Sequence, residues 1–342
     1  LRVEENLGEG YVRLRVSEAE RRQAKHDIQH VEDIVIEMLR NARDAGADKV
    51  YLATTKEEGV RTLLFLDNGS GVPQDMQERI FDARVTSKLE SMKMDRWGVH
   101  GRGMALFSIK QNTDEARVVT SGVDLGSAFK VCVATDRLGE RADQSSWPQA
   151  VKDEDGRYVC ARGPHNIIRA ACEFALEELR CCDVYLGSPS EIAATLYAQA
   201  SSRLDTSRLL FIDDECELPV IDRLGLASDA EDFIRICSGL GLEMSERTAH
   251  RILSGQIKPV RGVTARLLRE RDSTSHASAP VDLAKDRRGL RIAKDDMAKF
   301  SRAVERDFND LAARYYLNLC GDPKIRVSRD RITVTFDLAK EE

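Results

Sequence analysis

The chain has 342 residues, enough for two domains, and its 42% hydrophobic and 32% charged content is typical of a globular protein. No apolar stretch approaches the roughly 18 to 20 residues of a membrane helix, which excludes a membrane-spanning protein. The net charge of −6 gives no global attraction to nucleic acid. Eight dispersed cysteines without CxxC or His–Cys ligand spacing predict reduced thiols in a cytoplasmic protein and no zinc site. Because the chain begins at Leu1 rather than at a methionine, the sequence leaves a targeting segment open.

The first third of the chain alternates strands and helices. Residues 11–17 alternate like a strand, and residues 18–46 read as one helix with an apolar stripe, ended by Gly46 as its C-terminal cap. The strands "KVYLAT" and "RTLLFLD" follow, joined by the turn "KEEGV". The second strand ends in Asp67 of "DNGSGVP", a motif that fits either a plain Asn-Gly hairpin turn or a ligand site.

Three polar residues of the long helix share one face. Glu37, Asn41 and Asp44 recur at i, i+4 and i+7, close to the apolar stripe rather than opposite it. Polar groups are expensive to bury without partners, so this face predicts the wall of a cavity. A solvated helix edge is the alternative.

A glycine-rich loop precedes the next helix. Residues 84–97 lack periodicity and predict a mobile loop, in which Lys88 of "TSK" either contacts phosphate or is an ordinary solvated lysine. Gly98, Gly101 and Gly103 then precede a helix that starts near Met104. Glycines at a helix N-terminus let backbone N–H groups approach a phosphate, although a lone GxxGxG is weak support. The strands "ARVVTSG" and "GSAFKVCVAT" follow.

Together these motifs resemble the GHKL superfamily of gyrase B, heat-shock ATPase chaperones, histidine kinases and MutL proteins. The resemblance covers roughly residues 10–135 and rests on three motifs in order: an acidic-Asn helix, a strand ending in DxGxG, and a GxxGxG loop. It implies an α+β protein with a Bergerat-type sandwich, a mixed sheet with helices on one face. It also implies that Asp67 accepts a hydrogen bond from the adenine amino group of ATP, while Gly69 and Gly71 let the chain pass under the base. The implied phosphate contacts are Gly98, His100, Gly101, Arg102, Gly103 and Met104. Arg102 either adds a charge-assisted contact or faces solvent.

The resemblance also suggests a branch of the superfamily. Asn41 would coordinate Mg²⁺ bridging the phosphates. Glu37 matches the general base of hydrolysing members, where histidine kinases have Asn, and "EMLRNARDAGADKV" is more similar to the MutL and type II topoisomerase versions. The kinase alternative stays open because the short lid and "GSAFKV" are kinase-like. His26 in "KHDIQH" looks like a phosphoacceptor box, but a surface histidine beside Asp27 is the better interpretation, since no room remains for a phosphotransfer domain.

The C-terminal half predicts a polar linker (136–158), a helix, a strand and a further helix, then helix-turn-helix patterning in "AEDFIRICSGL" and "ERTAHRILSG". Between Met244 and Arg271 the chain carries seven basic and two acidic side chains, although a plain helical hairpin with a basic surface explains this equally simply. The expected contacts to DNA phosphates are Arg247, Thr248, His250, Arg251, Lys258 and Arg261. Residues 150–260 are loosely similar to the topoisomerase VI B subunit. After Arg271 only about 70 residues of this sequence follow, too few for the full transducer domain of that family. They predict a linker, the long helix "DDMAKFSRAVERDFNDLAARYYLNL" and a hairpin.

The sequence therefore predicts four segments: a GHKL ATP-binding domain (1–140), an α/β extension (141–230), a helix-turn-helix-like segment (231–272), and a linker, long helix and C-terminal β-hairpin (273–342). The predicted function is Mg²⁺-dependent ATP binding and hydrolysis, in which ATP binding closes the lid and drives homodimerisation. DNA or a separate DNA-acting subunit is the predicted client, without a membrane. One alternative is phosphotransfer of histidine-kinase type. The other is a non-hydrolysing ATP sensor that regulates transcription through the helix-turn-helix.

Overall fold

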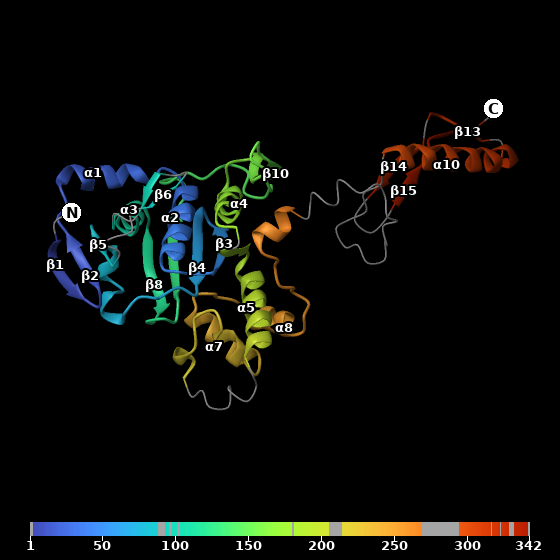
Figure 1. Cartoon of the computed structure of the whole chain (residues 1–342). Coiled ribbons are helices and arrows are strands. Elements are labelled where there is room, and N and C mark those ends of the chain that lie inside the picture. The colour runs from blue at the N-terminus through green and yellow to red at the C-terminus, as the bar shows by residue number, and fades with distance from the viewer. Residues whose placement is uncertain are drawn as a thin grey trace. The chain divides into compact units, whose positions relative to one another are not determined.

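The computed structural model describes residues 3–87, 93–95, 98–100, 103–179, 181–204, 214–268, 294–315, 317–321, 323–327 and 332–340. The chain divides into two compact units, Leu1–Ser273 and Thr274–Glu342, which are described separately (Figure 1). Within the described residues, no helix is both long and apolar enough to cross a membrane.

A five-stranded mixed sheet forms the centre of the first unit, in the order β12–β3–β4–β9–β8. Its strands are β3 (Lys49–Glu57), β4 (Val60–Asp67), β8 (Glu115–Ser121), β9 (Ser127–Ala134) and β12 (Asp183–Gly187). Strand β12 runs parallel to β3, whereas the other neighbours are antiparallel. The sequence places β12 in a separate extension, but its backbone hydrogen bonds to β3 include it in the sheet. Residues on both sides of position 140 therefore build one unit.

Both faces of this sheet are covered by helices. Leu52 and Phe65 enter one buried core, while their neighbours Tyr51 and Leu64 enter another, as the two-residue repeat of a strand requires. Burial on both faces explains why "TLLFL" is apolar without interruption. The first core is closed by α2 (Val31–Asp44) and α4 (Ile167–Glu177); the second is closed by α5 (Pro189–Arg203), α7 (Ala230–Gly239) and α8 (Glu246–Leu253) (Figure 1).

The predicted layer of helices on one face of a mixed sheet is confirmed. The second layer comes from the region in which the sequence placed an extension and a helix-turn-helix-like segment. Helices α7 and α8 use their apolar sides, including Phe233 and Ile252, to cover the back of the sheet. They are consequently part of the same folded unit as the cavity-forming face.

The single helix predicted over residues 18–46 is wrong, because the structure has two. Helix α1 (Glu18–Asp27) ends before Ile28, and α2 begins at Val31. The Asp33 Oδ2 atom accepts hydrogen bonds from the backbone N–H groups of Gln29 and His30, at 2.8 and 2.9 Å, and this cap starts a new helix. At the other end, Gly46 has φ of +77°, so the predicted C-terminal cap is confirmed.

Residues 84–97, predicted as a loop, contain short strands. Strand β5 (Val85–Thr86) joins the N-terminal hairpin of β1 (Val3–Gly8) and β2 (Tyr11–Leu14), because its backbone pairs with β2. Strands β6 (Lys93–Asp95) and β7 (Gly98–His100) pair with each other. Between β4 and β8 the chain also forms two 3₁₀ helices, η1 (Gln74–Met76) and η2 (Arg79–Phe81), and the α-helix α3 (Ala105–Asn112).

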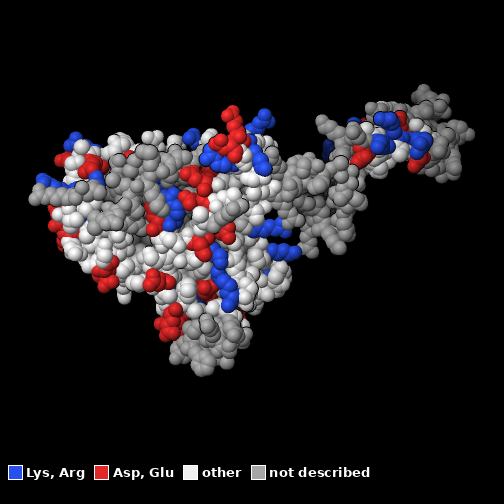
Figure 2. Space-filling model, viewed as in Figure 1, with Lys and Arg blue, Asp and Glu red and all other residues white. Residues whose placement is uncertain are grey.

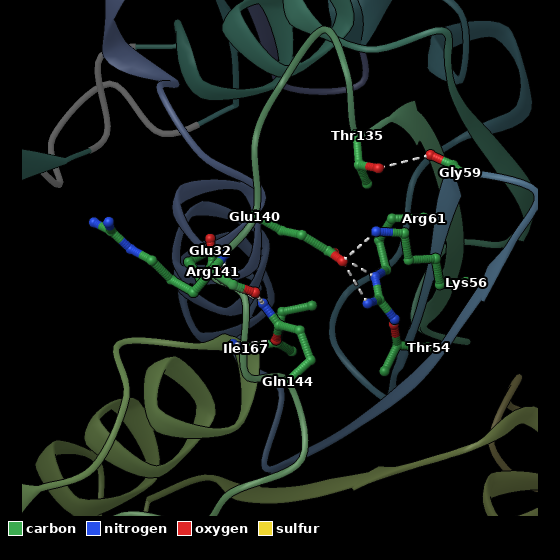
Figure 3. Close-up of polar contacts among 10 residues, drawn as sticks. All are labelled: Glu32, Thr54, Lys56, Gly59, Arg61, Thr135, Glu140, Arg141, Gln144 and Ile167. Carbon is green, nitrogen blue, oxygen red and sulfur yellow. Dashed lines mark hydrogen bonds and ion pairs between the residues drawn. The ribbon is translucent and has the colours of Figure 1, made fainter.

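The predicted linker at 136–158 is fastened to the sheet and to α2 (Figure 3). Glu140 accepts hydrogen bonds from Arg61 Nε at 2.7 Å and from Lys56 Nζ at 2.8 Å. On the opposite side, Glu32 Oε1 accepts from the backbone N–H of Arg141 at 3.0 Å and from Gln144 Nε2 at 2.6 Å. The 3₁₀ helices η3 (Glu215–Glu217) and η4 (Arg223–Leu226) lie further along the chain. The segment 136–158 also contains β10 (Gln149–Lys152), which pairs with β11 (Tyr158–Arg162). It is therefore an ordered part of the unit.

The second unit contains helix α10 (Lys294–Tyr315) and two small antiparallel ladders. Its strands are β13 (Leu317–Leu319), β14 (Lys324–Val327), β15 (Ile332–Thr335) and β16 (Leu338–Lys340). The predicted hairpin is formed by β14 and β15. The predicted helix is too long by its last turn, since "LNL" pairs with β16 instead.

Candidate active site

A cavity of about 590 Å³ lies between α1, α2, α3 and the sheet. This volume is within the usual range of small-molecule sites. Seven of the residues predicted to bind a nucleotide line it: Glu37, Asn41, Asp44, Asp67, Gly71, Gly103 and Met104. The sequence motifs suggested that these three separate segments meet, and in the structure they border one cavity.

Helix α2 supplies the polar wall of the cavity. Its apolar residues are buried in the first core, and this fixes the rotation of the helix so that Glu37, Asn41 and Asp44 border the cavity. Asn41 Nδ2 is buried and has no hydrogen-bond partner in the described part of the chain. Glu37 is 22% exposed and forms an ion pair with Arg40, with Nη1 and Oε1 2.7 Å apart. The solvated-edge interpretation of this helix face is therefore wrong.

A second arginine of α2 braces the wall from outside. Arg43 Nε lies 3.0 Å from Asp44 Oδ1, and Arg43 Nη1 lies 2.9 Å from Oε1 of Glu178, which follows the last residue of α4. Although burial alone would lower it, hydrogen bonds and charge from these two carboxylates raise the pKa of Arg43. The pair fixes α2 against α4 and holds Asp44 at the edge of the cavity.

Asp67 closes the inner end of the cavity. It is the last residue of β4 and is only 4% exposed. Its Oδ1 atom accepts a hydrogen bond from the backbone N–H of Gly69 at 2.8 Å, which orients the carboxylate. The sheet therefore delivers a buried, oriented acceptor group to a largely apolar part of the site, next to Phe65 and Phe129.

The glycines after Asp67 are required by close backbone packing. Gly71 has φ of +69°, and a Cβ atom there would collide with the carbonyl oxygen of Gly122. Gly126 has φ of +78°, and its Cβ would collide with the carbonyl oxygen of Asp67. A Cβ at Gly69 would lie 2.9 Å from Ala45. The loop after β4 is thus wedged between α2 and the β8–β9 turn, and the plain-hairpin interpretation of "DNGSG" is wrong.

The other end of the cavity faces the start of α3. Gly103 has φ of +66°, its carbonyl accepts a hydrogen bond from Arg84 N at 2.8 Å, and Met104 is the N-cap residue. Helix N-termini favour anions, because their backbone N–H groups are unsatisfied. Gly98 and His100 belong to β7. Lys88, Gly101 and Arg102 lie outside the described residues.

Several lining residues were missed by sequence reasoning. Helix α1 contributes Gln23 and Asp27, which have no motif of their own. Tyr11 lies at the rim, where burial raises the pKa of its hydroxyl. The pair Gly122 and Gly126 in "SGVDLGS" was a usable signal, because two glycines in a short turn indicate close packing or positive φ. Other missed lining residues include Arg40, Phe65, Thr86, Ser87, Ser108, Ser127 and Phe129.

Comparison with known proteins agrees with this geometry. Residues 28–129 match the family described as "Histidine kinase-, DNA gyrase B-, and HSP90-like ATPase". This segment is a GHKL ATPase domain. It contains α2, the Asp67 loop, α3 and the first three residues of β9, and therefore most of the cavity wall.

The chain is also similar to curated MutL proteins. It is 34% identical over 112 residues to "DNA mismatch repair protein MutL" of Brucella abortus (strain S19), covering 32% of this chain and 18% of the relative. The MutL protein of Thermodesulfovibrio yellowstonii is 31% identical over 107 residues, covering 31% and 19%. The chain thus matches less than a fifth of the length of these relatives.

The predicted DNA contacts lie away from this cavity, on and after α8. Arg247, His250 and Arg251 are exposed on α8, and Lys258 and Arg261 are exposed in the segment that follows. Thr248 is half-buried and contacts Ser245 at the start of the helix. Arg247, Arg251 and Lys258 form no ion pair within the described part of the chain, whereas His250 lies 3.7 Å from Glu246. Arg247, His250 and Arg251 thus share one exposed surface of α8.

Proposed function

We propose that this chain binds ATP with Mg²⁺, hydrolyses it with Glu37 as general base, and uses the cycle to act on DNA. The observation that carries the proposal is the convergence of Glu37, Asn41 and Asp67 on one cavity of a GHKL domain. Asp67 would accept a hydrogen bond from the adenine amino group at the inner end. The N-terminus of α3, with Gly103, would receive the phosphates at the outer end.

The hydrolytic step needs a proton acceptor next to the terminal phosphate. In the proposed step, a water oxygen attacks the terminal phosphorus, Glu37 takes the proton of that water, and ADP leaves as the β–γ bond breaks. A positioned carboxylate contributes on the order of 10²- to 10⁴-fold in rate. Glu37 borders the cavity and is held in place by Arg40, which meets the requirement for a fixed base.

The donor set of the cavity fits magnesium held jointly with phosphate. Among the described residues, no group of three or more His, Cys, Asp or Glu side chains could hold a metal by itself. Magnesium usually keeps several waters and takes one or two protein oxygens plus phosphate oxygens. Asn41 would supply such an oxygen from a carboxamide whose Nδ2 atom is buried, and bound Mg²⁺ would neutralise phosphate charge.

DNA is the proposed client for two reasons. The relatives with the same domain are named DNA mismatch repair proteins, and the exposed arginines of α8 lack ion-pair partners among the described residues. Elsewhere on the visible face of the first unit, acidic and basic side chains are interspersed (Figure 2). The proposed contact is therefore local: Arg247, Arg251, Lys258 and Arg261 against phosphates, with Thr248 and His250 beside them.

The remaining proposals concern assembly, location and relationship. ATP-dependent homodimerisation, with or without a separate DNA-acting subunit, is proposed from the resemblance to the superfamily. A cytoplasmic location is proposed because eight dispersed cysteines without CxxC spacing are typical of reduced thiols. Relationship to the topoisomerase VI B subunit stays a proposal for residues 150–260.

Phosphate release from ATP and Mg²⁺ tests the catalytic part. We expect Glu37→Gln to reduce turnover by at least about 100-fold while the affinity for ATP is retained. The matched control is Glu32→Gln on the same helix, which contacts Arg141 and Gln144 outside the cavity and should turn over normally. ATP binding without Glu37-dependent turnover would instead favour the non-hydrolysing sensor, and acid-labile phosphate retained on the protein would favour phosphotransfer.

Fluorescence anisotropy with duplex DNA tests the client. We expect Arg247→Glu with Arg251→Glu to weaken binding and to reduce the dependence of affinity on salt concentration. The control is Arg157→Glu, which changes a comparably exposed charge in the β10–β11 hairpin. Equal loss in both variants, or no binding by the unmodified chain, would refute the α8 surface as the DNA contact.

A further inference from the structure

The charge of the cavity poses a problem for a triphosphate ligand. Four carboxylates line the cavity: Asp27, Glu37, Asp44 and Asp67. Among the described residues that line it, the one basic side chain is that of Arg40. Like charges in a partly dehydrated site repel strongly, so a polyanion binds there only if cationic groups compensate. Arg40 is therefore the described side chain best suited to receive phosphate.

The position of Arg40 is specific to the cavity side of α2. Its side chain is only 3% exposed, and it stands one residue before Asn41. Arg43, one turn later, is also buried, but it contacts Asp44 and Glu178 and is not among the residues that line the cavity. Of these two arginines of α2, therefore, only Arg40 lines the cavity.

The contact of Arg40 with Glu37 adds a second role. The guanidinium donates from Nη1 to Glu37 Oε1 at 2.7 Å, across one turn of the helix. A guanidinium is a rigid planar fork that matches both carboxylate and phosphate oxygens. One group can consequently orient the carboxylate and attract the anion that the carboxylate must approach.

We propose that Arg40 recognises the phosphate chain of the nucleotide and, through the same guanidinium, positions Glu37 beside the terminal phosphate. This inference rests on the proposed ATP site and adds a residue to it. Arg40 acts in two ways: phosphate affinity comes from its charge, and the orientation of Glu37 comes from its fork. A side chain that only stabilised α2 would affect neither property selectively.

The test compares ATP with adenosine, which lacks phosphates. Affinities for both are measured by isothermal titration calorimetry for the unmodified chain, Arg40→Met and Arg169→Met. We expect Arg40→Met to lower the affinity for ATP by about tenfold or more, since charged hydrogen bonds are lost, and to leave adenosine binding unchanged. Arg169→Met is the matched control, because Arg169 of α4 is also largely buried and pairs with Glu173 at 2.9 Å outside the cavity; its ratio of ATP to adenosine affinity should equal that of the unmodified chain.

Turnover gives the second readout. At saturating ATP and Mg²⁺ we expect Arg40→Lys, which keeps the buried charge, to lower kcat because a lysine is a point charge without the fork. This variant also lowers the ATP-to-adenosine ratio several-fold, and it replaces Arg40→Met if that protein does not fold. An unchanged ratio and an unchanged kcat in the folded variant overturn the inference alone. Failure of the unmodified chain to bind ATP overturns both the inference and the proposed site.

Discussion

The packing under Gly71 makes a quantitative prediction that separates two costs. In Gly71→Ala, the left-handed backbone at φ +69° costs about 1–2 kcal/mol for any L side chain. The new Cβ also meets the carbonyl oxygen of Gly122, a backbone atom that no rotamer change can move. Overpacking of this kind costs about 1–3 kcal/mol more. Gly59→Ala is the matched control, because Gly59 has φ of +82° but no atom within 4 Å of the added Cβ.

The extra 1–3 kcal/mol or so in Gly71→Ala must appear in one of two observables. If the loop keeps its position, the free energy of unfolding falls by that amount relative to Gly59→Ala. If the loop moves to relieve the collision, ATP must restore it, and the affinity falls by roughly 5- to 150-fold. Urea unfolding and calorimetric ATP titration on both variants measure the two losses. Equal stability and equal ATP affinity in the two variants would refute the packing argument for this glycine.

Two further predictions concern the buried ion pairs around the domain. Burial raises the pKa of Glu140, but hydrogen bonds from Arg61 and Lys56 outweigh this and hold the pKa below its ordinary value of 4.5. The ionised Glu140 therefore stabilises the fold fully above pH 4.5, and this stabilisation is lost as the pH falls towards the pKa in the folded state. Glu140→Gln should lower the free energy of unfolding by about 3 kcal/mol at neutral pH, because Arg61 stays buried without its carboxylate partner. In acid titration followed by circular dichroism, the difference in stability between this variant and the unmodified chain should narrow below pH 4.5. A difference that does not depend on pH would contradict this. Arg43→Met should lower the free energy of urea unfolding by about 3–5 kcal/mol, because it removes the cation that pairs with Asp44 and Glu178. A loss below about 1 kcal/mol would show that solvent already screens these ion pairs.

Much of the site could be predicted from the sequence because its motifs are local. The spacing of Glu37, Asn41 and Asp44 follows from helix geometry, and the apolar run before Asp67 specifies a strand. What these motifs face, however, depends on chain segments far away. Arg40 is a helix residue like any other until the structure places it on the cavity wall beside Glu37.

The errors of prediction have physical causes that periodicity does not capture. The break between α1 and α2 depends on one Asp33 side chain capping two backbone N–H groups, and this competes successfully with a continuous helical pattern. The segment around residue 140 is polar, as linkers are, yet its Glu140 forms an ion pair with Arg61. Polarity indicates a linker only when the charges face water.

The second helical layer changes how the ATP site and the α8 surface could influence each other. Strand β4 ends in Asp67, and its Leu64 and Leu66 are buried in the same core as Ile252 of α8. Close-packed cores transmit displacement because they contain few voids that could absorb it. A shift of β4 on nucleotide binding would therefore act directly on the helices behind the sheet. A flexible linker between separate domains would transmit no such displacement, whereas the shared core makes direct coupling physically available to this chain.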